Sequence, residues 1–551
     1  FIWLECVAVG VLLAALVTAC SARLQRRWLQ TIWPTLILFL LALKSAAAIL
    51  VASVLAAHGS IPDWRLYAWS LGLVMLCAAG AVSWRGLRIG KETGPRARDW
   101  PRARLGVALL VAVGLNVATF GNMDNSVRLK LAGLQAEAGA LALSVAPARV
   151  PDRRNAAILY EKAFAVEKDS SAAAAAKERI WLDRKARIDA TRNDAGLSAY
   201  LLKNRGRLDL LGRASAMEDC YFEHTYARPS FDMLLPEIQH IRDGARLLRL
   251  RAEKRASDGN PRGALEDIRA IRRMAEHIRS EPILISTLVS VACDAIADEA
   301  LEDVLHLSDP QTDDLPVLGT ATIPSYRRAY RRSMIMEEAF GLSAFAMLSA
   351  DTGDLIGTLQ AMQSGATVTV SPPGAFLLSP LAATWRVFAL PGELAVYRSR
   401  LRQVQQLSLQ PYHLAAKRWK NMETQLNTRR SGIMVSLLLP ALSRCAETAA
   451  RAQARRTLAN LAVAAEHYRL HKAGYPASAG DLVPTYIPAV PIDPFDGKPL
   501  RLVRADGGLV LYSVGPDLKD DSGAEWDRTK KTGDVTFCLG KAFEARRLKA
   551  K

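Results

Sequence analysis

Histidine and cysteine side chains at short spacings are the first candidates for chemistry in this sequence. Cys220 and His224 stand four residues apart, and His240 follows sixteen residues later. Thiolate and imidazole bind zinc, but structural zinc sites usually contain paired cysteines, which are missing around these residues. His467 and His471 share a helix face, without the Glu that follows the first His of a zinc protease. We expect neither set to bind a metal.

One tripeptide matches a known catalytic pattern. Asp351, Thr352 and Gly353 have the order found in aspartic proteases, in which two such Asp residues share a proton. No second copy occurs in the sequence, and the tripeptide follows a helical run. We therefore interpret it as a helix stop with Gly as the terminator. Four cysteines beyond the first 121 residues could form disulfides, with the pairing left open: Cys220, Cys293, Cys445 and Cys538.

The composition excludes several classes of protein. The 551 residues are 50% hydrophobic and 23% charged, with a formal net charge of +18 and seven Cys. Such a chain is neither disordered, nor collagen-like, nor a small disulfide scaffold. Basic residues cluster in two loops of the first 121 residues with few aromatic residues between them, so we expect no binding to nucleic acid.

Four apolar stretches, at 2–21, 32–57, 66–84 and 105–120, predict a transmembrane anchor over residues 1–121. The loops after the first and third stretches are rich in Arg, which predicts that they face the cytoplasm. Everything beyond Gly121 would then lie outside the cytoplasm. The sequence predicts a multi-pass protein of the bacterial inner membrane, with the lipid bilayer as one partner.

Two charged residues fall within these apolar stretches. Lys44 lies in the second stretch and Glu5 in the first, and counting residues from the inner ends of the two stretches places them at similar depth. We expect an intramembrane ion pair between Glu5 and Lys44. Snorkelling of the Lys side chain and a transport role are the alternatives.

Residues 122–352 carry the spacing of amphipathic helices. The clearest hairpin has apolar positions from Ile241 to Ala252, a break at Asp258 to Pro261, and the same period again from Ala264. This hairpin resembles a tetratricopeptide (TPR) unit, but no sustained repeat follows. Residues 353–431 are expected to be a linker with connecting helices.

Residues 432–540 combine a helix with a small sheet. An Ala- and Arg-rich helix is expected to reach about Lys472, where Gly474 caps it. Ser478 is the expected N-cap of a short helix. Alternating apolar residues on either side of Asp506, Gly507 and Gly508 predict a β-hairpin. An acidic loop follows, and residues 541–551 form a basic tail.

This region resembles the major pseudopilin of type II secretion. The shared features are the long helix, Tyr475-Pro476, the segment Asp493-Pro494-Phe495-Asp496-Gly497-Lys498-Pro499, and the final Tyr512-Ser513-Val514-Gly515-Pro516-Asp517. The whole chain also resembles large helical membrane proteins of planctomycete-type bacteria. The expected fold is a multidomain membrane protein with a four-helix transmembrane anchor, a mainly α exterior domain of TPR-like hairpins and a small α+β pseudopilin-like module.

The resemblance also implies a cofactor, because the corresponding loop of the major pseudopilin binds calcium. It places Asp517, Asp520, Asp521 and Asp534 in the candidate positions. Calcium takes six to eight oxygen ligands, and clustered carboxylates repel one another without a cation. The alternative is a solvated acidic loop.

The sequence therefore favours a non-enzymatic, membrane-anchored scaffold that binds other envelope proteins, with a link to type II secretion or envelope assembly. The alternative is an extracytoplasmic hydrolase whose active site the sequence does not reveal. A cluster of titratable groups in a pocket would favour the hydrolase. An apolar groove would favour the scaffold.

Overall fold

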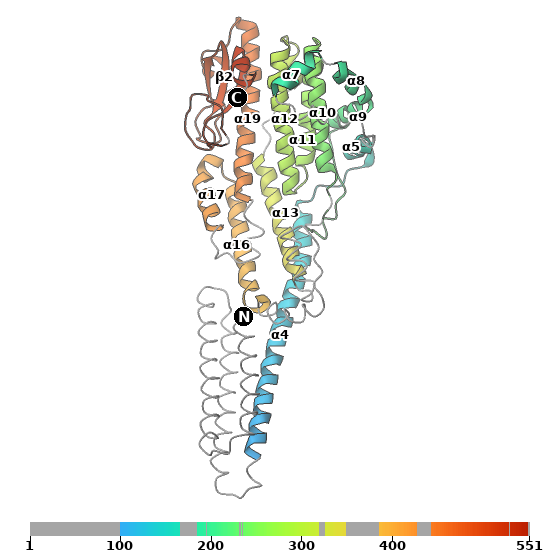
Figure 1. Ribbon diagram of the computed structural model, residues 1–551, viewed down its shortest axis with the longest axis vertical. Helices are drawn as coiled ribbons and strands as arrows, with labels where there is room; N and C mark the ends of the chain where they lie inside the picture. The colour runs from blue at the N-terminus through green and yellow to red at the C-terminus, as the bar shows by residue number, and fades with distance from the viewer. Residues whose placement is uncertain are drawn as a thin grey trace. The chain divides into compact units, whose positions relative to one another are not determined.

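The computed structural model describes residues 100–165, 184–193, 195–230, 233, 235–318, 326–348, 385–426, 442–527 and 529–548. These residues are mostly helical, with one small three-stranded sheet (Figure 1). They fall into two compact units. The described part of the first comprises 100–136, 342–348 and 385–399, and that of the second runs from 137 to 341, 400 to 426 and 442 to 548 with the gaps above.

Three helices contribute residues to both units: α4 (Trp100–Val145), α13 (Tyr326–Met347) and α16 (Leu390–Ser408). In the first unit, Asp124 of α4 lies between two arginines. The Arg128 Nε donates to it at 2.8 Å, and the Nε of the fully buried Arg386 is 3.6 Å away. A ring contact between Phe345 and Tyr397 also lies within this unit.

The predicted transmembrane anchor is contradicted by the structure. None of the helices in the described ranges is long and apolar enough to cross a membrane. The fourth predicted stretch, 105–120, falls in α4 and spans only about 24 Å at about 1.5 Å per residue, less than the about 30 Å of hydrocarbon. The other three stretches, and the predicted pair of Glu5 and Lys44, lie outside the described residues. The prediction of a multi-pass inner-membrane protein was therefore wrong.

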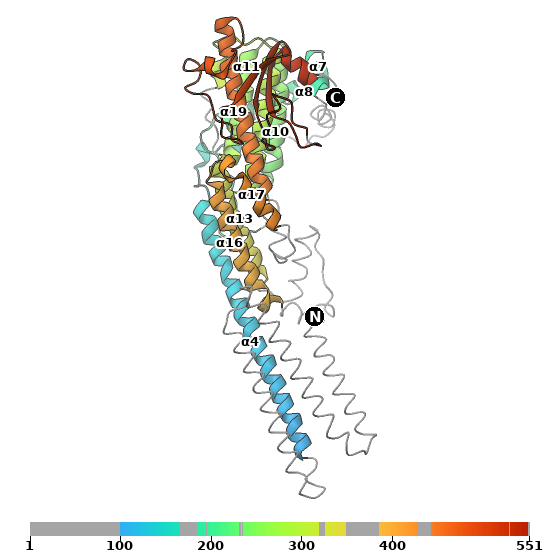
Figure 2. The same cartoon turned by 90° about the vertical axis from the view of Figure 1, so that its left-hand side faces the viewer.

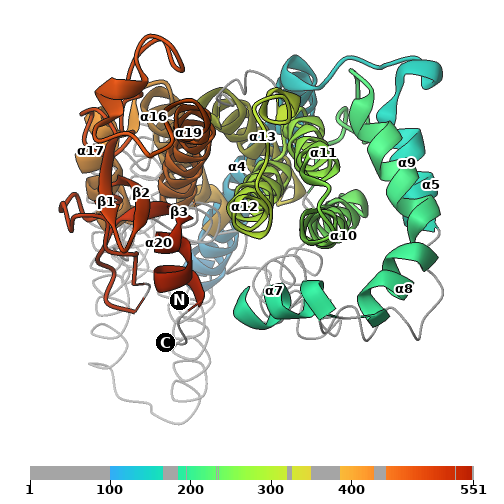
Figure 3. The same ribbon diagram turned by 90° about the horizontal axis from the view of Figure 1, so that it is seen from above.

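The second unit is built on three long helices, α10 (Glu237–Ser257), α11 (Pro261–Arg279) and α12 (Leu284–Leu307), which pack side by side (Figures 1 and 3). Of the shorter helices beside them, α5 (Ala156–Ala165) and α8 (Ala195–Lys203) pack against α9 (Arg205–Ala216). Helix α7 (Arg184–Asn193) packs against α10. Short 3-10 turns occur at Asp152–Arg154 and Leu315–Leu318.

The predicted helical hairpin is confirmed as α10 and α11. Ala252 and Ala264, one on each helix, are fully buried, so the two backbones can approach closely. The Asn260 side chain accepts a hydrogen bond from Gly263 N at 2.9 Å and caps α11, and Pro261 occupies the first helical position. Gly259 has φ +79°, a conformation that Gly adopts without steric cost.

The C-terminal module begins with α19 (Leu442–Lys472) and the short turn η5 (Ala479–Leu482). The predicted N-cap is confirmed, because Ser478 and Asp481 form a capping box. The predicted cap at Gly474 is wrong, since the preceding Ala473 takes the left-handed conformation with φ +52°. Helix α17 (Tyr412–Leu426) packs against α19, as Figure 2 shows.

The predicted β-hairpin is also confirmed, as β1 (Arg501–Ala505) and β2 (Gly508–Ser513) joined by Asp506 and Gly507, both with positive φ. A third strand, β3 (Val535–Gly540), which the sequence did not reveal, pairs antiparallel with β2. One face of the sheet packs on α19 through Leu509 and Leu511, and the opposite face contacts Phe543. The described residues end with α20 (Lys541–Phe543) and a turn at Glu544–Leu548.

Candidate functional site

Buried ion pairs join the three-helix layer to the C-terminal module. On α12, Asp294, Asp298 and Glu302 recur every four residues and so line one helix face. Arg456 of α19 reaches two of them, with Nη2 at 2.5 Å from Asp294 Oδ1 and Nε at 2.9 Å from Asp298 Oδ1. Arg272 of α11 also contacts Asp298, at 3.2 Å. All of these side chains are almost completely buried.

A second group of ion pairs surrounds the end of α12. Glu302 accepts hydrogen bonds from Arg184 Nη2 at 2.8 Å and from the backbone N of Cys538, in β3, at 2.6 Å. Arg547, near the C-terminus, also contacts Glu302, at 3.2 Å. Burial alone would raise the pKa of Asp303, but the neighbouring arginines hold it below the usual value. The paired charges favour a fixed arrangement of α12 and the sheet.

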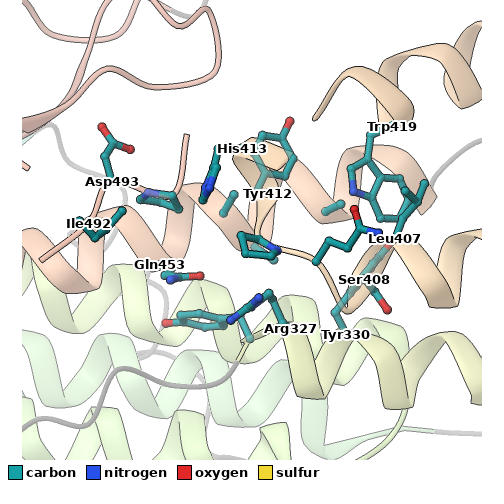
Figure 4. A pocket seen from close by; sticks show the side chains of 17 residues that line it. Arg327, Tyr330, Leu407, Ser408, Tyr412, His413, Trp419, Gln453, Ile492 and Asp493 are labelled. Atoms are coloured by element: carbon teal, nitrogen blue, oxygen red, sulfur yellow. The ribbon is translucent and has the colours of Figure 1, made fainter. Parts of the chain in front are cut away.

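The described residues of the second unit also enclose a cavity of about 230 Å³ (Figure 4). Aromatic and aliphatic side chains make up most of its wall. Tyr326 and Tyr330 come from α13, Trp419 from α17, and Tyr412 and His413 from the first turn of α17. Three alanines of α19 line the cavity as well, and small side chains there leave the space open: Ala446, Ala449 and Ala450.

Exposed apolar residues occur in the cavity lining or directly next to it in sequence. Ile492 lines it and is 50% exposed, whereas Leu409 and Leu414, each next in sequence to lining residues, are 55% and 63% exposed. Exposed apolar side chains that gather around a concave site are a mark of an interaction surface. We call these three residues the apolar rim.

The Asp-Pro-Phe-Asp-Gly segment that resembles a pseudopilin motif forms one side of the cavity. His413 N donates to Pro494 O at 3.0 Å, and a Cβ at Gly497 would lie 2.9 Å from His413 Cδ2. Gly497 also has φ +74°, so both the contact and the backbone require Gly there. This segment therefore anchors the start of α17.

Most polar atoms at the cavity already have partners. The fully buried Asp493 carboxylate accepts hydrogen bonds from Ser513 Oγ at 2.8 Å and from the backbone N of Phe495 and of Val514, each at 2.9 Å. His413 Nδ1 differs, because it is buried and has no hydrogen-bond partner in the part of the chain that the structure describes. A bound molecule could supply that partner.

The four predicted calcium ligands lie in the loop between β2 and β3, and the carboxylates of Asp517, Asp520 and Asp534 are already bonded within the protein. Asp534 accepts from Gly523 N at 2.7 Å, and Asp517 accepts from Gly533 N and Lys519 N at 3.3 Å. Asp520 Oδ2 is 3.0 Å from Arg501 Nε. Asp521 is the fourth predicted ligand, and its backbone N lies 3.5 Å from Asp534 Oδ1. The described ranges contain no group of three or more His, Cys, Asp or Glu side chains placed to hold a metal ion.

Calcium binding nevertheless stays a prediction with a direct test. Burial, and secondarily the nearby Asp520 and Asp521, raise the pKa of Asp534 to about 6, and a bound cation would stabilise its charged form. If the loop binds calcium, millimolar calcium should raise the melting temperature of the full chain, since RT ln(1 + [L]/Kd) is about 2.7 kcal/mol at a hundredfold excess. An identical melting curve in chelator would show a solvated acidic loop.

The other residues singled out in the sequence are dispersed. His240 stacks on Phe164 with ring centroids 4.9 Å apart, and His471 Nδ1 is 3.1 Å from the Tyr486 hydroxyl. The four cysteines beyond residue 121 are all buried, and none of them forms a disulfide within the described residues. The Asp351 tripeptide lies outside the described residues.

His224 lies between two buried carboxylates. Its Nε2 is 3.4 Å from Glu237 Oε1 and 3.5 Å from Glu281 Oε2, and the Tyr226 hydroxyl donates to Glu281. Burial would lower the pKa of His224, but the hydrogen bond to Glu237 and the charges of both carboxylates raise it. Burial also raises the pKa of Glu281, and Arg332 faces the same cluster.

We expect the segment around His224 to lose stability as pH rises. A raised pKa in the folded state means that protonation stabilises the fold at low pH, and His224 and Glu281 both act in this direction. Amide exchange in residues 217–230, corrected for the intrinsic rate, should therefore increase between about pH 6 and pH 8. His224→Gln should weaken that dependence. Equal pH dependence in the two proteins would contradict this role of His224.

Comparisons of this chain with protein-family models, with curated proteins and with solved structures found no match. We therefore infer function from the geometry of the second unit.

Proposed function

We propose that this chain is a non-enzymatic interaction scaffold, and that its second unit binds a partner protein by taking one apolar side chain into the aromatic cavity. The observation that carries this proposal is the cavity together with its apolar rim. Sites that bury drug-sized molecules have about 300–1,000 Å³, whereas this cavity has about 230 Å³. Such a size suits a single anchor side chain, and buried anchors supply most of the energy of protein interfaces.

The alternative, a hydrolase, has less support at this site. General acid–base catalysis needs a titratable group that can exchange a proton with the substrate. The cavity's carboxylate, Asp493, instead accepts three hydrogen bonds from the protein. His413 also lines the cavity and is titratable, but the rest of the described wall is mainly aromatic and aliphatic side chains, which suit binding rather than proton transfer.

The resemblance of residues 432–537 to the major pseudopilin supports a partner class. A long helix, α19, followed by a small antiparallel sheet suits that resemblance. We therefore propose the proteins of a type II secretion assembly as the first partners to examine.

A random peptide library selected on the immobilised full chain tests the scaffold function. We expect enrichment of peptides with one large apolar residue. Ala449→Trp should fill the cavity and weaken their binding at least about tenfold, a loss of about 1.4 kcal/mol. Ala416→Trp is the matched control, because Ala416 lies on α17 outside the cavity lining. Failure to enrich peptides, or equal binding to Ala449→Trp, would overturn the proposal.

A further inference from the structure

The surface beside the cavity carries an excess of positive charge. Arg327 lines the cavity, and Arg418 Nη1 lies 3.5 Å from the side-chain oxygen of Gln410, another lining residue. Arg331 and Lys417 each follow a lining residue by four positions on the same helix, so they lie one turn further along. All four cations are exposed.

Acidic residues near the cavity do not neutralise these cations. Among the described lining residues the acid is Asp493, which is fully buried and bonded to β2 and its own loop. Glu447 stands one turn before Ala450 on α19, and it pairs with Arg451 at 3.3 Å. Arg327 makes one long contact, 3.5 Å to the Leu409 carbonyl, and otherwise its exposed side chain faces solvent.

From this arrangement we infer that the partner segment is an acidic peptide: an apolar anchor flanked by Asp or Glu residues. This inference rests on the proposed function and names its partner chemistry. The anchor enters the cavity beside the packed rings of Tyr330 and Trp419, whose centroids are 6.1 Å apart. The flanking carboxylates lie over Arg327 and Arg418. The unpartnered His413 Nδ1 can form a hydrogen bond with a peptide group, as donor or acceptor according to its tautomer. Complementary charge speeds association and selects among partners.

Three synthetic peptides test the inference. Each has one central Trp, flanked by Glu in the first, Gln in the second and Lys in the third, and carries a fluorescent label for anisotropy measurements on the full chain. At about 50 mM salt the Glu peptide should bind at least about tenfold more tightly than the Gln peptide, and the Lys peptide should bind most weakly. The difference should shrink at about 300 mM salt, where exposed charges are screened.

Charge-reversal variants test whether Arg327 and Arg418 select the peptide, and a second pair of exposed arginines supplies the matched control. Arg327→Glu combined with Arg418→Glu should reverse the order of the Glu and Lys peptides. Arg205→Glu combined with Arg213→Glu changes the net charge equally on exposed sites of α9 and should leave the order unchanged. Each double variant should keep the far-ultraviolet dichroism of the original protein.

The outcomes separate the inference from the proposed function. If the Glu and Gln peptides bind equally and Ala449→Trp weakens both, the scaffold function stands and the acidic partner is wrong. If Ala449→Trp weakens neither, the cavity is not a docking site and both proposals fail. If the full chain self-associates and Ala449→Trp abolishes that association, the occupant is a second copy of this chain, and the acidic peptide is again wrong.

Discussion

Replacing Arg456 by Met should increase amide exchange in α12 and α19 by at least about a hundredfold. Asp294 and Asp298 would then lose their closest partner on α19 and remain buried. Removing one member of a buried ion pair costs about 3–5 kcal/mol. Asp294 keeps Arg279 and Asp298 keeps Arg272, so we expect the cost to lie at the lower end of that range. Hydrogen–deuterium exchange with mass spectrometry measures this effect locally, which suits a chain with two units.

Arg451→Met is the matched control for this prediction. Arg451 lies on the same helix, and its pair with Glu447 is about one-third exposed on the Arg side. Exposed pairs contribute about 0–1 kcal/mol, so exchange should change by less than about tenfold. If Arg456→Met behaves like Arg451→Met, the buried ion pairs do not hold the C-terminal module on the three-helix layer.

Replacing Asp493 by Ala should destabilise the C-terminal module almost as strongly. The variant would leave three donors without an acceptor: Ser513 Oγ and the backbone N of Phe495 and of Val514. Each buried donor left unsatisfied costs about 1–3 kcal/mol, so the expected total is at least about 3 kcal/mol. Exchange in β2 should rise about a hundredfold, and peptide binding at the cavity should weaken.

Asp496→Ala is the comparison within the same segment. Asp496 is partly exposed and pairs with Arg501 at 2.6 Å, so water can replace the lost contacts. We expect a change of about 1 kcal/mol or less. Equal effects of the two substitutions would show that burial of Asp493 is not what makes it important.

Local sequence patterns predicted the local structure well. The α10–α11 hairpin follows from apolar spacing interrupted at Asp258 to Pro261, and the β1–β2 hairpin follows from Asp506 and Gly507. Each depends on residues close together in sequence. The predicted left-handed cap of α19 was misplaced by one residue, since Ala473 and not Gly474 adopts the left-handed conformation.

Long-range contacts explain what the sequence did not predict. Asp298 and Arg456 are 158 residues apart, so the four-residue spacing of acids on α12 gave no sign of their partners. The cavity draws its wall from α13, α17, α19 and the segment at Asp493, which meet only after folding. The membrane prediction rested on four apolar stretches, and the one that the structure describes, 105–120 in α4, does not give a helix long and apolar enough to cross a membrane.

The most direct test of the account is to locate a bound peptide. A selected peptide that carries a photoreactive benzophenone in place of its apolar anchor should cross-link, after irradiation with the full chain, to the residues around the cavity. Mass spectrometry should place the cross-links on Tyr330, Trp419 or the α19 segment from Ala446 to Gln453, and free peptide should abolish them. Cross-links confined to other parts of the chain would contradict the claim that this cavity receives the partner's side chain.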